Sequence, residues 1–198
     1  FLDREEAPDS VNPVLWRLAR LNLVNGLFQV TDRIYQVRGF DVSNMTIVEG
    51  ATGLVVIDPL GTLETAKAAI ELYRANRGPR PVRAVIYTHS HLDHYGGVRG
   101  VVSDDDVRAG VRVIAPSGFL EAAVSENVFA GNAMSRRATY MFGTLLAKGE
   151  KGHVDCGIGK AYPTGSPTLI PPTETFPVDP SKQVETWVVD GVEIELRN

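Results

Sequence analysis

The residues best suited to chemistry lie in one short stretch, residues 88–97. Three of the four histidines in the 198-residue chain occur here within six positions, in the order His89, His91, Asp93 and His94. Imidazole nitrogens and a carboxylate oxygen, without cysteine, suit Zn²⁺, with Fe or Mn as alternatives. Structural zinc usually has four protein ligands, often including cysteine, whereas a histidine-rich site with an open position generates hydroxide near neutral pH. The stretch therefore predicts a catalytic metal site.

The arrangement of these ligands depends on the path of the backbone. If the chain stays extended as it leaves a strand, the alternation of side chains places His89, His91 and Asp93 on one side. His94 then faces elsewhere unless the chain turns, and the two glycines that close the stretch make a turn easy. The four ligands could serve two metal ions in two pairs, or one ion with fewer ligands.

A βαβ unit is expected to position this stretch. Residues 54–57 are apolar without alternation, which indicates a strand buried on both faces and ending at Asp58. A helix should follow the N-cap Thr62 and stop at Gly78. Residues 82–87 form the next strand, which leads directly into the histidines. Asp58 could accept a hydrogen bond from a ligand histidine, or it could simply cap the helix.

The remaining elements are predicted from hydrophobic periodicity and turn residues. We expect a helical extension within residues 1–25, two hairpins over residues 27–57, and a strand at 111–115. Two helices should span 116–128 and 132–148, the second stopping at Gly149 and packing one apolar face in the core. That face consists of Met134, Ala138, Met141 and Leu145.

Three further segments complete the expected architecture. Asp104 to Asp106 should form a solvated loop rather than a cation site. Residues 149–184 are rich in Gly and Pro and predict a long irregular loop, which could be a lid, a wrap over the surface or an arm that grips a partner. Asp190 and Gly191 predict a type I′ hairpin between strands at 185–189 and 192–196.

Composition limits the class of protein. With 43% hydrophobic residues the chain can bury a core, and one domain is expected. A net charge of −4, with both signs interspersed, offers no basic surface for nucleic acid. The single cysteine, Cys156, excludes an internal disulfide, and no apolar run is long enough to predict a membrane span. The chain begins without a signal peptide or an initiator methionine, so it looks processed or cut from something longer.

Residues 88–97 resemble the metal motif of the metallo-β-lactamase superfamily. Three other segments resemble the alkyl sulfatases of that superfamily, enzymes that hydrolyse dodecyl sulfate and related detergents. These segments are residues 37–44, residues 125–138 and residues 169–173. The similarity extends from about Asn12 to Leu196. It implies an α/β fold, namely the N-terminal half of an αββα sandwich with a mixed sheet and flanking helices.

The resemblance also implies roles for the ligands. His89 and His91 would hold one zinc ion, and Asp93 and His94 would hold a second. A metal-bound hydroxide would attack an alkyl sulfate ester, and Asp93 could also accept a proton. Another hydrolase of the same superfamily, such as a lactonase or thioesterase, is the alternative. A non-catalytic fragment with a role in assembly is a third possibility.

In the family, two glutamates and another histidine complete the site, and a dimerisation domain and a C-terminal domain follow. The resemblance therefore implies that this chain carries half of a dinuclear site, is inactive alone, and needs the remainder of its polypeptide or a complementary chain. It also implies a homodimer and a periplasmic or secreted location. His153 matches no family ligand and should be solvated or structural. Asn127, Arg136 and Arg137 could meet sulfate oxygens, and Tyr162 could lie near the cleft.

Overall fold

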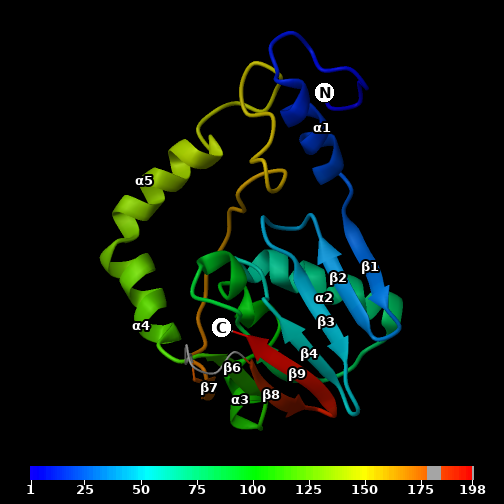
Figure 1. Cartoon of the computed structure of the whole chain (residues 1–198), viewed down its shortest axis with the longest axis vertical. Helices are drawn as coiled ribbons and strands as arrows, with labels where there is room; N and C mark the ends of the chain where they lie inside the picture. Colours follow the sequence, from blue (N-terminus) through cyan, green and yellow to red (C-terminus); the bar gives the residue numbers. More distant parts are fainter. Residues whose placement is uncertain (178–183, 198) are drawn as a thin grey trace.

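A seven-stranded mixed sheet forms the centre of the computed structural model, which describes residues 1–177 and 184–197. Its strands follow one another in chain order, antiparallel from β1 to β4 and parallel from β4 to β7 (Figure 1). The strands are β1 (Gly26–Thr31), β2 (Ile34–Arg38), β3 (Met45–Glu49), β4 (Leu54–Ile57), β5 (Val82–Ile86), β6 (Arg112–Pro116) and β7 (Glu174–Phe176). The α/β prediction with a mixed sheet is confirmed.

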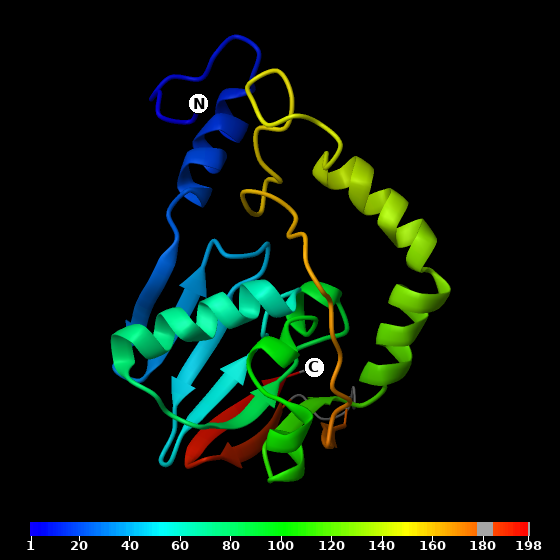
Figure 2. The same cartoon turned by 180° about the vertical axis from the view of Figure 1, so that it is seen from behind.

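Helix α2 (Leu63–Arg77) covers one face of the sheet, and the hairpin of β8 (Val184–Val189) and β9 (Val192–Arg197) covers the other (Figures 1 and 2). Side chains of β4 and β5 alternate between these two layers, as the two-residue period of a strand requires. Val56 and Val85 belong to the core that contains α2, whereas Val55 and Ala84 belong to the core under the hairpin. The expected burial of β4 on both faces is therefore confirmed.

The predicted helix caps and the hairpin turn are also confirmed. Thr62 accepts a hydrogen bond from the Thr65 amide at the start of α2, and Gly78 ends the helix with φ of 84°. Asp190 and Gly191 both have positive φ, 47° and 75°, which a type I′ turn needs. The Asp190 carboxylate accepts a hydrogen bond of 2.8 Å from the Gly53 amide, so this turn is fastened to the turn between β3 and β4.

An arm of two helices stands away from the sheet (Figure 1). It consists of α4 (Phe119–Val124), a π-helical turn η3 (Ser125–Phe129) and α5 (Gly131–Phe142). The prediction that α5 continues to Gly149 is wrong, because Gly143 adopts a left-handed conformation and ends it. The predicted core face is also wrong: α5 has no buried residue, and Met141 and Leu145 are 56% and 86% exposed.

The three consecutive aspartates are exposed, as expected, but they form a helix rather than a loop. Asp104, Asp105 and Asp106 are the first turn of α3 (Asp104–Arg108). Ser103 and Asp106 bond each other's backbone amides in a capping box, and carboxylates are favoured at the positive end of a helix dipole. Sequence reasoning missed this cap.

Helix α1 (Pro13–Asn22) lies within the predicted helical extension, has Asn12 as its N-cap, and lies far from the sheet's centre (Figure 2). Its Trp16 and Ala19 pack with Val11 and Val154 in a small separate core, which we call the N-terminal cluster. The cluster thus joins the start of the chain to the loop that follows the arm.

The long loop predicted over residues 149–184 is irregular across most of its described part, although β7 lies within it. Residues 178–183 of that prediction lie outside the described residues. The loop runs past the histidine stretch: the Thr168 amide bonds the Gly96 carbonyl at 2.7 Å, and the Leu63 amide bonds the Ser166 carbonyl at 3.0 Å. It therefore wraps over the surface beside the site.

None of the helices in the described ranges combines the length and the apolar run that crossing a bilayer requires.

Candidate metal centre

The candidate site lies where two parallel strands end. Asp58 directly follows β4, and the histidine stretch follows the neighbouring β5. The Asp58 amide bonds the Ile86 carbonyl at 2.9 Å, which fixes the two strand ends side by side. Loops at the carboxyl ends of parallel strands are the usual place for a binding site in an α/β sheet.

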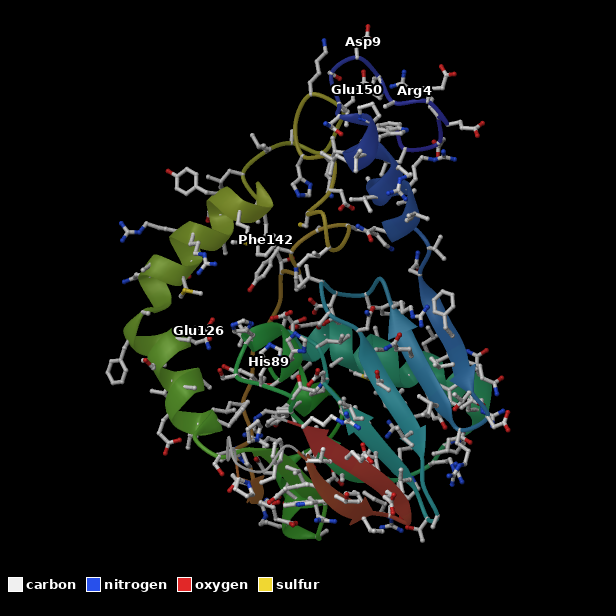
Figure 3. All side chains as sticks on the ribbon, in the orientation of Figure 1. Arg4, Asp9, His89, Glu126, Phe142 and Glu150 are labelled. Atoms are coloured by element: carbon white, nitrogen blue, oxygen red, sulfur yellow. The ribbon has the colours of Figure 1, made fainter. Side chains whose placement is uncertain are left out.

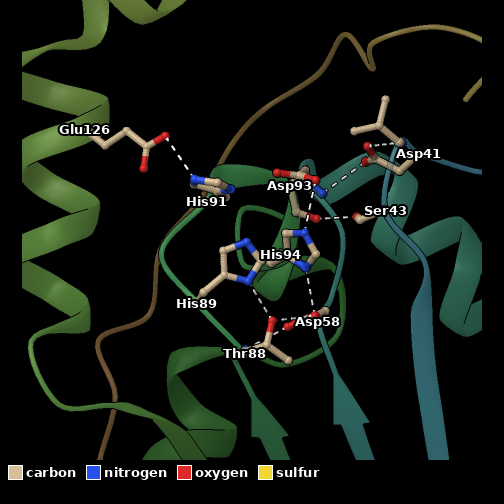
Figure 4. A network of polar contacts seen from close by, with 11 residues as sticks. Asp41, Ser43, Asp58, Thr88, His89, His91, Asp93, His94 and Glu126 are labelled. Atoms are coloured by element: carbon tan, nitrogen blue, oxygen red, sulfur yellow. Dashed lines mark hydrogen bonds and ion pairs between the residues drawn. The ribbon is translucent and has the colours of Figure 1, made fainter. Parts of the chain in front are cut away.

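The chain turns earlier than the sequence predicts. His91 is still extended, but residues 92–94 form a 3₁₀ turn, η1 (Leu92–His94). Asp93 therefore leaves the alternation expected for a strand, and the turn brings His94 back towards His89, with ring centroids 4.1 Å apart. The rings of His89 and His91 are 4.7 Å apart. The three imidazoles thus gather at one place (Figure 4).

The glycines after the stretch permit close packing rather than making this turn. A Cβ atom on Gly96 would lie 2.2 Å from the Gly61 carbonyl oxygen, and one on Gly97 would lie 2.2 Å from the Pro59 carbonyl oxygen. Only glycine allows the histidine segment to lie this close to the loop after β4.

Each imidazole has an oxygen near one of its nitrogens. Thr88 Oγ1 lies 2.9 Å from His89 Nδ1, and Asp58 Oδ2 lies 2.7 Å from His94 Nδ1. Glu126 Oε1 lies 3.8 Å from His91 Nε2 (Figure 4). An oxygen partner at one ring nitrogen is the usual arrangement of metal-binding histidines, because it directs the other nitrogen to the ion.

Asp93 and Asp58 make the His94 imidazole more basic than an ordinary histidine. Asp93 Oδ2 lies 3.2 Å from His94 Nε2, on the side of the ring opposite to Asp58. Burial lowers the pKa of His94, but the hydrogen bonds with both carboxylates outweigh it and raise the pKa to about 9. Burial works against ionisation of Asp93, yet the bond to His94 holds its pKa below the usual range. For His89, burial and the two neighbouring rings lower the pKa.

The donor types fit zinc, but the side chains are not arranged around a single point. Within residues 1–177 and 184–197, no three His, Cys, Asp or Glu side chains form a group that could hold a metal ion. The Nε2 atom of His94 is turned towards Asp93 instead. The structure therefore brings His89, His91, Asp93 and His94 together without showing a complete ligand shell.

Two residues that sequence reasoning did not single out hold the backbone around the site: Ser43 holds Asp93, and Asp41 holds the loop after β4. Ser43 Oγ donates to the Asp93 carbonyl oxygen. The buried Asp41 carboxylate accepts from the Gly61 amide and from Thr65 Oγ1, both at 3.0 Å. Burial raises the pKa of Asp41 despite these bonds. Asp41 and Ser43 lie within residues 37–44, but nothing in their spacing connects them to the histidines.

Tyr162 lies beside the site, as the sequence suggested. It lines a pocket of about 140 Å³ together with Asp93, Leu92 and Gly61. Burial and the nearby Asp93 raise the pKa of Tyr162. Its ring also stacks on Phe142 at the end of α5, with centroids 5.1 Å apart.

The other predicted polar residues lie in different surroundings. The Asn127 amide nitrogen bonds Tyr95 Oη at 3.1 Å and the Ala123 carbonyl at 3.0 Å, so its donors are engaged within the protein. Arg136 and Arg137 are exposed on α5. His153 is only 7% exposed and lies 3.5 Å from Cys156 Sγ, which identifies it as a structural rather than a solvated residue.

The mixed sheet and the histidine-rich loop after β5 agree with a protein of the metallo-β-lactamase class. A sequence profile described as the metallo-beta-lactamase superfamily matches residues 38–121. A linear primary-alkylsulfatase of Pseudomonas sp. is 57% identical over 193 residues, 97% of this chain and 28% of that protein. An alkyl/aryl-sulfatase of Saccharomyces cerevisiae is 55% identical over 194 residues, 98% of this chain and 29% of that protein.

A solved structure is also similar to this chain in sequence and in fold. The stereoselective inverting sec-alkylsulfatase from Pseudomonas sp. is 50% identical, covers 100% of this chain and superimposes with a TM-score of 0.92. The chain belongs to the metallo-β-lactamase superfamily, and its similarity to the alkylsulfatases extends over nearly its whole length. It spans less than a third of the length of these relatives.

Proposed function

We propose that this chain is part of an enzyme that hydrolyses alkyl sulfate esters. The observation that carries this proposal is the identity of 49–57%, across nearly the whole chain, to three proteins named as alkylsulfatases. The histidine cluster at the end of β5 supports it, because cations held by these histidines would stabilise the negative charge on the sulfate oxygens.

His89 and His91 would hold one zinc ion, and Asp93 and His94 a second, with Fe or Mn as alternatives. When bound there, zinc would act as a Lewis acid that polarises water and offsets the negative charge of the sulfate oxygens. The ligand types support this assignment, since neutral imidazole and carboxylate are common zinc ligands.

The chain's own residues would orient these ligands. Thr88 and Asp58 engage the Nδ1 atoms of His89 and His94, so the Nε2 atoms would face the ions, and Asp93 would have to turn from His94 Nε2 to bind the second one. Ser43 holds the backbone of Asp93. Tyr162 shares the pocket with Asp93 and would lie beside the substrate. A sulfate contact by Asn127 or Arg136 stays a prediction.

The rest of a longer polypeptide would complete the site. Because the chain spans less than a third of its relatives, we propose that further metal ligands and the dimerisation and C-terminal domains lie beyond residues 1–198. Assembly as a homodimer and a periplasmic or secreted location belong to the same proposal.

The direct test is release of inorganic sulfate from dodecyl sulfate by the full-length protein. We expect turnover that a chelator removes and added Zn²⁺ restores. His91→Ala should abolish sulfate release, whereas Ser90→Ala, in the same stretch, should retain it. A lactone and a thioester serve as comparison substrates. Turnover of either one without sulfate release would overturn the proposal in favour of another hydrolase of the superfamily.

A further inference from the structure

The arm contacts the histidine cluster through its π-helical turn. Two successive residues of η3 face the site: Glu126 Oε1 lies 3.8 Å from His91 Nε2, and Asn127 bonds Tyr95 Oη at 3.1 Å. Figure 3 shows Glu126 on the arm, on the side that faces His89. The neighbouring Val128 and Phe129 point outwards and are 69% and 85% exposed.

The π turn is a specific feature of this helix. The Ala130 amide bonds the Ser125 carbonyl, five residues earlier, at 2.9 Å. Such turns are rare within helices and occur frequently at functional sites. Here the π turn is the part of the arm that contacts the histidines. The Glu126 side chain is only 24% exposed there.

A carboxylate beside one imidazole nitrogen determines what the other nitrogen can do. At 3.8 Å the contact between Glu126 and His91 is longer than a hydrogen bond, but it is a favourable electrostatic contact with a proton on Nε2. An imidazole with its proton on Nε2 presents the lone pair of Nδ1 to a ligand. Asp58 engages the other nitrogen of its histidine: it contacts Nδ1 of His94, whose Nε2 faces the predicted ligand Asp93.

We propose that Glu126 is a positioning residue for His91: it holds the proton on Nε2 and directs Nδ1 towards the metal ion. This inference rests on the proposed metal site. It makes the α4–η3–α5 arm part of the metal centre, although the arm contributes no ligand to the predicted set. Partners of this kind typically change metal affinity by about 10- to 100-fold.

The test compares zinc dissociation constants of full-length variants, measured by competition with a chromophoric chelator. Glu126→Ala should raise the dissociation constant about 10-fold or more. Glu126→Gln keeps an oxygen acceptor and should lose less. Glu121→Ala, which removes an exposed glutamate from α4, is the matched control and should leave zinc binding unchanged. Thermal unfolding midpoints identify any variant that has lost its fold.

The outcomes separate this inference from the proposed function. If Glu126→Ala binds zinc as tightly as the wild type while sulfate release persists, the positioning role is wrong and the function stands. If Glu126→Ala weakens zinc binding but zinc-loaded wild-type protein releases no sulfate, the function is wrong and the positioning role stands. Equal losses in Glu126→Ala and Glu121→Ala would also overturn the positioning role.

Discussion

At the residue scale, the structure places side-chain oxygen atoms beside ring nitrogens of the histidines. Asp58 is the clearest case, because its backbone has a positive φ of 54°, which is unfavourable for a residue with a side chain. In this conformation its carboxylate bonds the Thr88 amide at 2.9 Å, Thr88 Oγ1 at 2.8 Å and His94 Nδ1 at 2.7 Å. Backbone strain of this kind collects at functional sites, where surrounding contacts maintain it.

Asp58→Asn tests this arrangement with little change in shape. Asparagine tolerates a left-handed backbone as well as aspartate does. Its amide can still accept from the Thr88 backbone, but it cannot both do so and accept from His94 Nδ1. We expect zinc affinity of the full-length protein to fall about 10-fold, measured by chelator competition. Unchanged affinity would mean that Asp58 serves only to join the two strand ends.

Glu49 is a second residue with several partners, remote from the site. It accepts from Tyr73 Oη at 2.7 Å and from Arg77 Nε at 3.1 Å, and Arg80 lies 3.4 Å away. Burial raises the pKa of Glu49, but the bonds from Arg77 and Tyr73 outweigh it and hold the pKa below the usual 4.5. The ionised carboxylate is therefore the form that stabilises the fold.

Glu49→Gln should lower the free energy of unfolding by about 1 kcal/mol at neutral pH. A lowered pKa in the folded state means that the contribution of the wild-type carboxylate is complete above 4.5 and is lost as the pH falls through the folded pKa. The difference between wild type and variant should therefore shrink in acid, as measured by urea denaturation across pH. Glu71→Gln, at an exposed glutamate, is the control, and a difference that grows in acid would contradict the assignment.

At the scale of elements, close packing of the histidine segment on the loop after β4 and on α2 holds the site. A Cβ atom on Gly97 would lie 2.6 Å from both Ala66 Cβ and the Thr62 carbonyl oxygen. The β4–loop–α2 unit and the segment that follows the η1 turn are therefore packed closely together.

Gly97→Ala should disturb that packing. We expect a loss of about 1–3 kcal/mol in the free energy of unfolding, because the methyl group has no space. Gly131→Ala is the matched control, since a Cβ atom there meets nothing within 4 Å and alanine favours a helix. Chemical denaturation of both variants provides the measurement. Equal stability of the two variants would contradict this expectation, because it would mean that the loop after β4 shifts to accommodate the added methyl group at little cost.

At the scale of the whole molecule, the N-terminal cluster joins the start of the chain to the loop that follows the arm. Trp16 is 1% exposed, and its indole Nε1 donates to the Arg4 carbonyl oxygen at 3.1 Å. Asn22 of α1 donates to Asp155 at 2.9 Å, and Arg4 pairs with Glu150 (Figure 3). This cluster is separate from the two cores of the sheet.

Trp16→Ala should therefore release the N-terminal cluster without unfolding the sheet. Loss of a buried tryptophan typically costs about 3–5 kcal/mol, more than a cluster of this size can sustain. Limited proteolysis should cut within residues 1–25 and near Glu150, while the main unfolding transition is preserved. Val14→Ala, at a position 57% exposed on the same helix, should stay resistant. Cooperative loss of the whole fold would contradict the independence of the cluster.

The sequence by itself determined the local features of this protein. Periodicity and turn residues identified six of the seven strands of the sheet, the βαβ unit, the caps of α2 and the Asp190-Gly191 turn, because each depends on neighbours within a few residues; β7 was missed within the long loop. The types of ligand in residues 88–97 were also evident, because they are adjacent in the chain.

Only the tertiary structure decided how those ligands are supported. The bond from Asp58 to His94 joins residues 36 positions apart, and the bond from Ser43 to Asp93 joins residues 50 positions apart. The exposure of α5 and the approach of Glu126 to His91 were hidden for the same reason. No local pattern records which distant segment packs against a residue, so the orientation of each histidine depends on the folded chain.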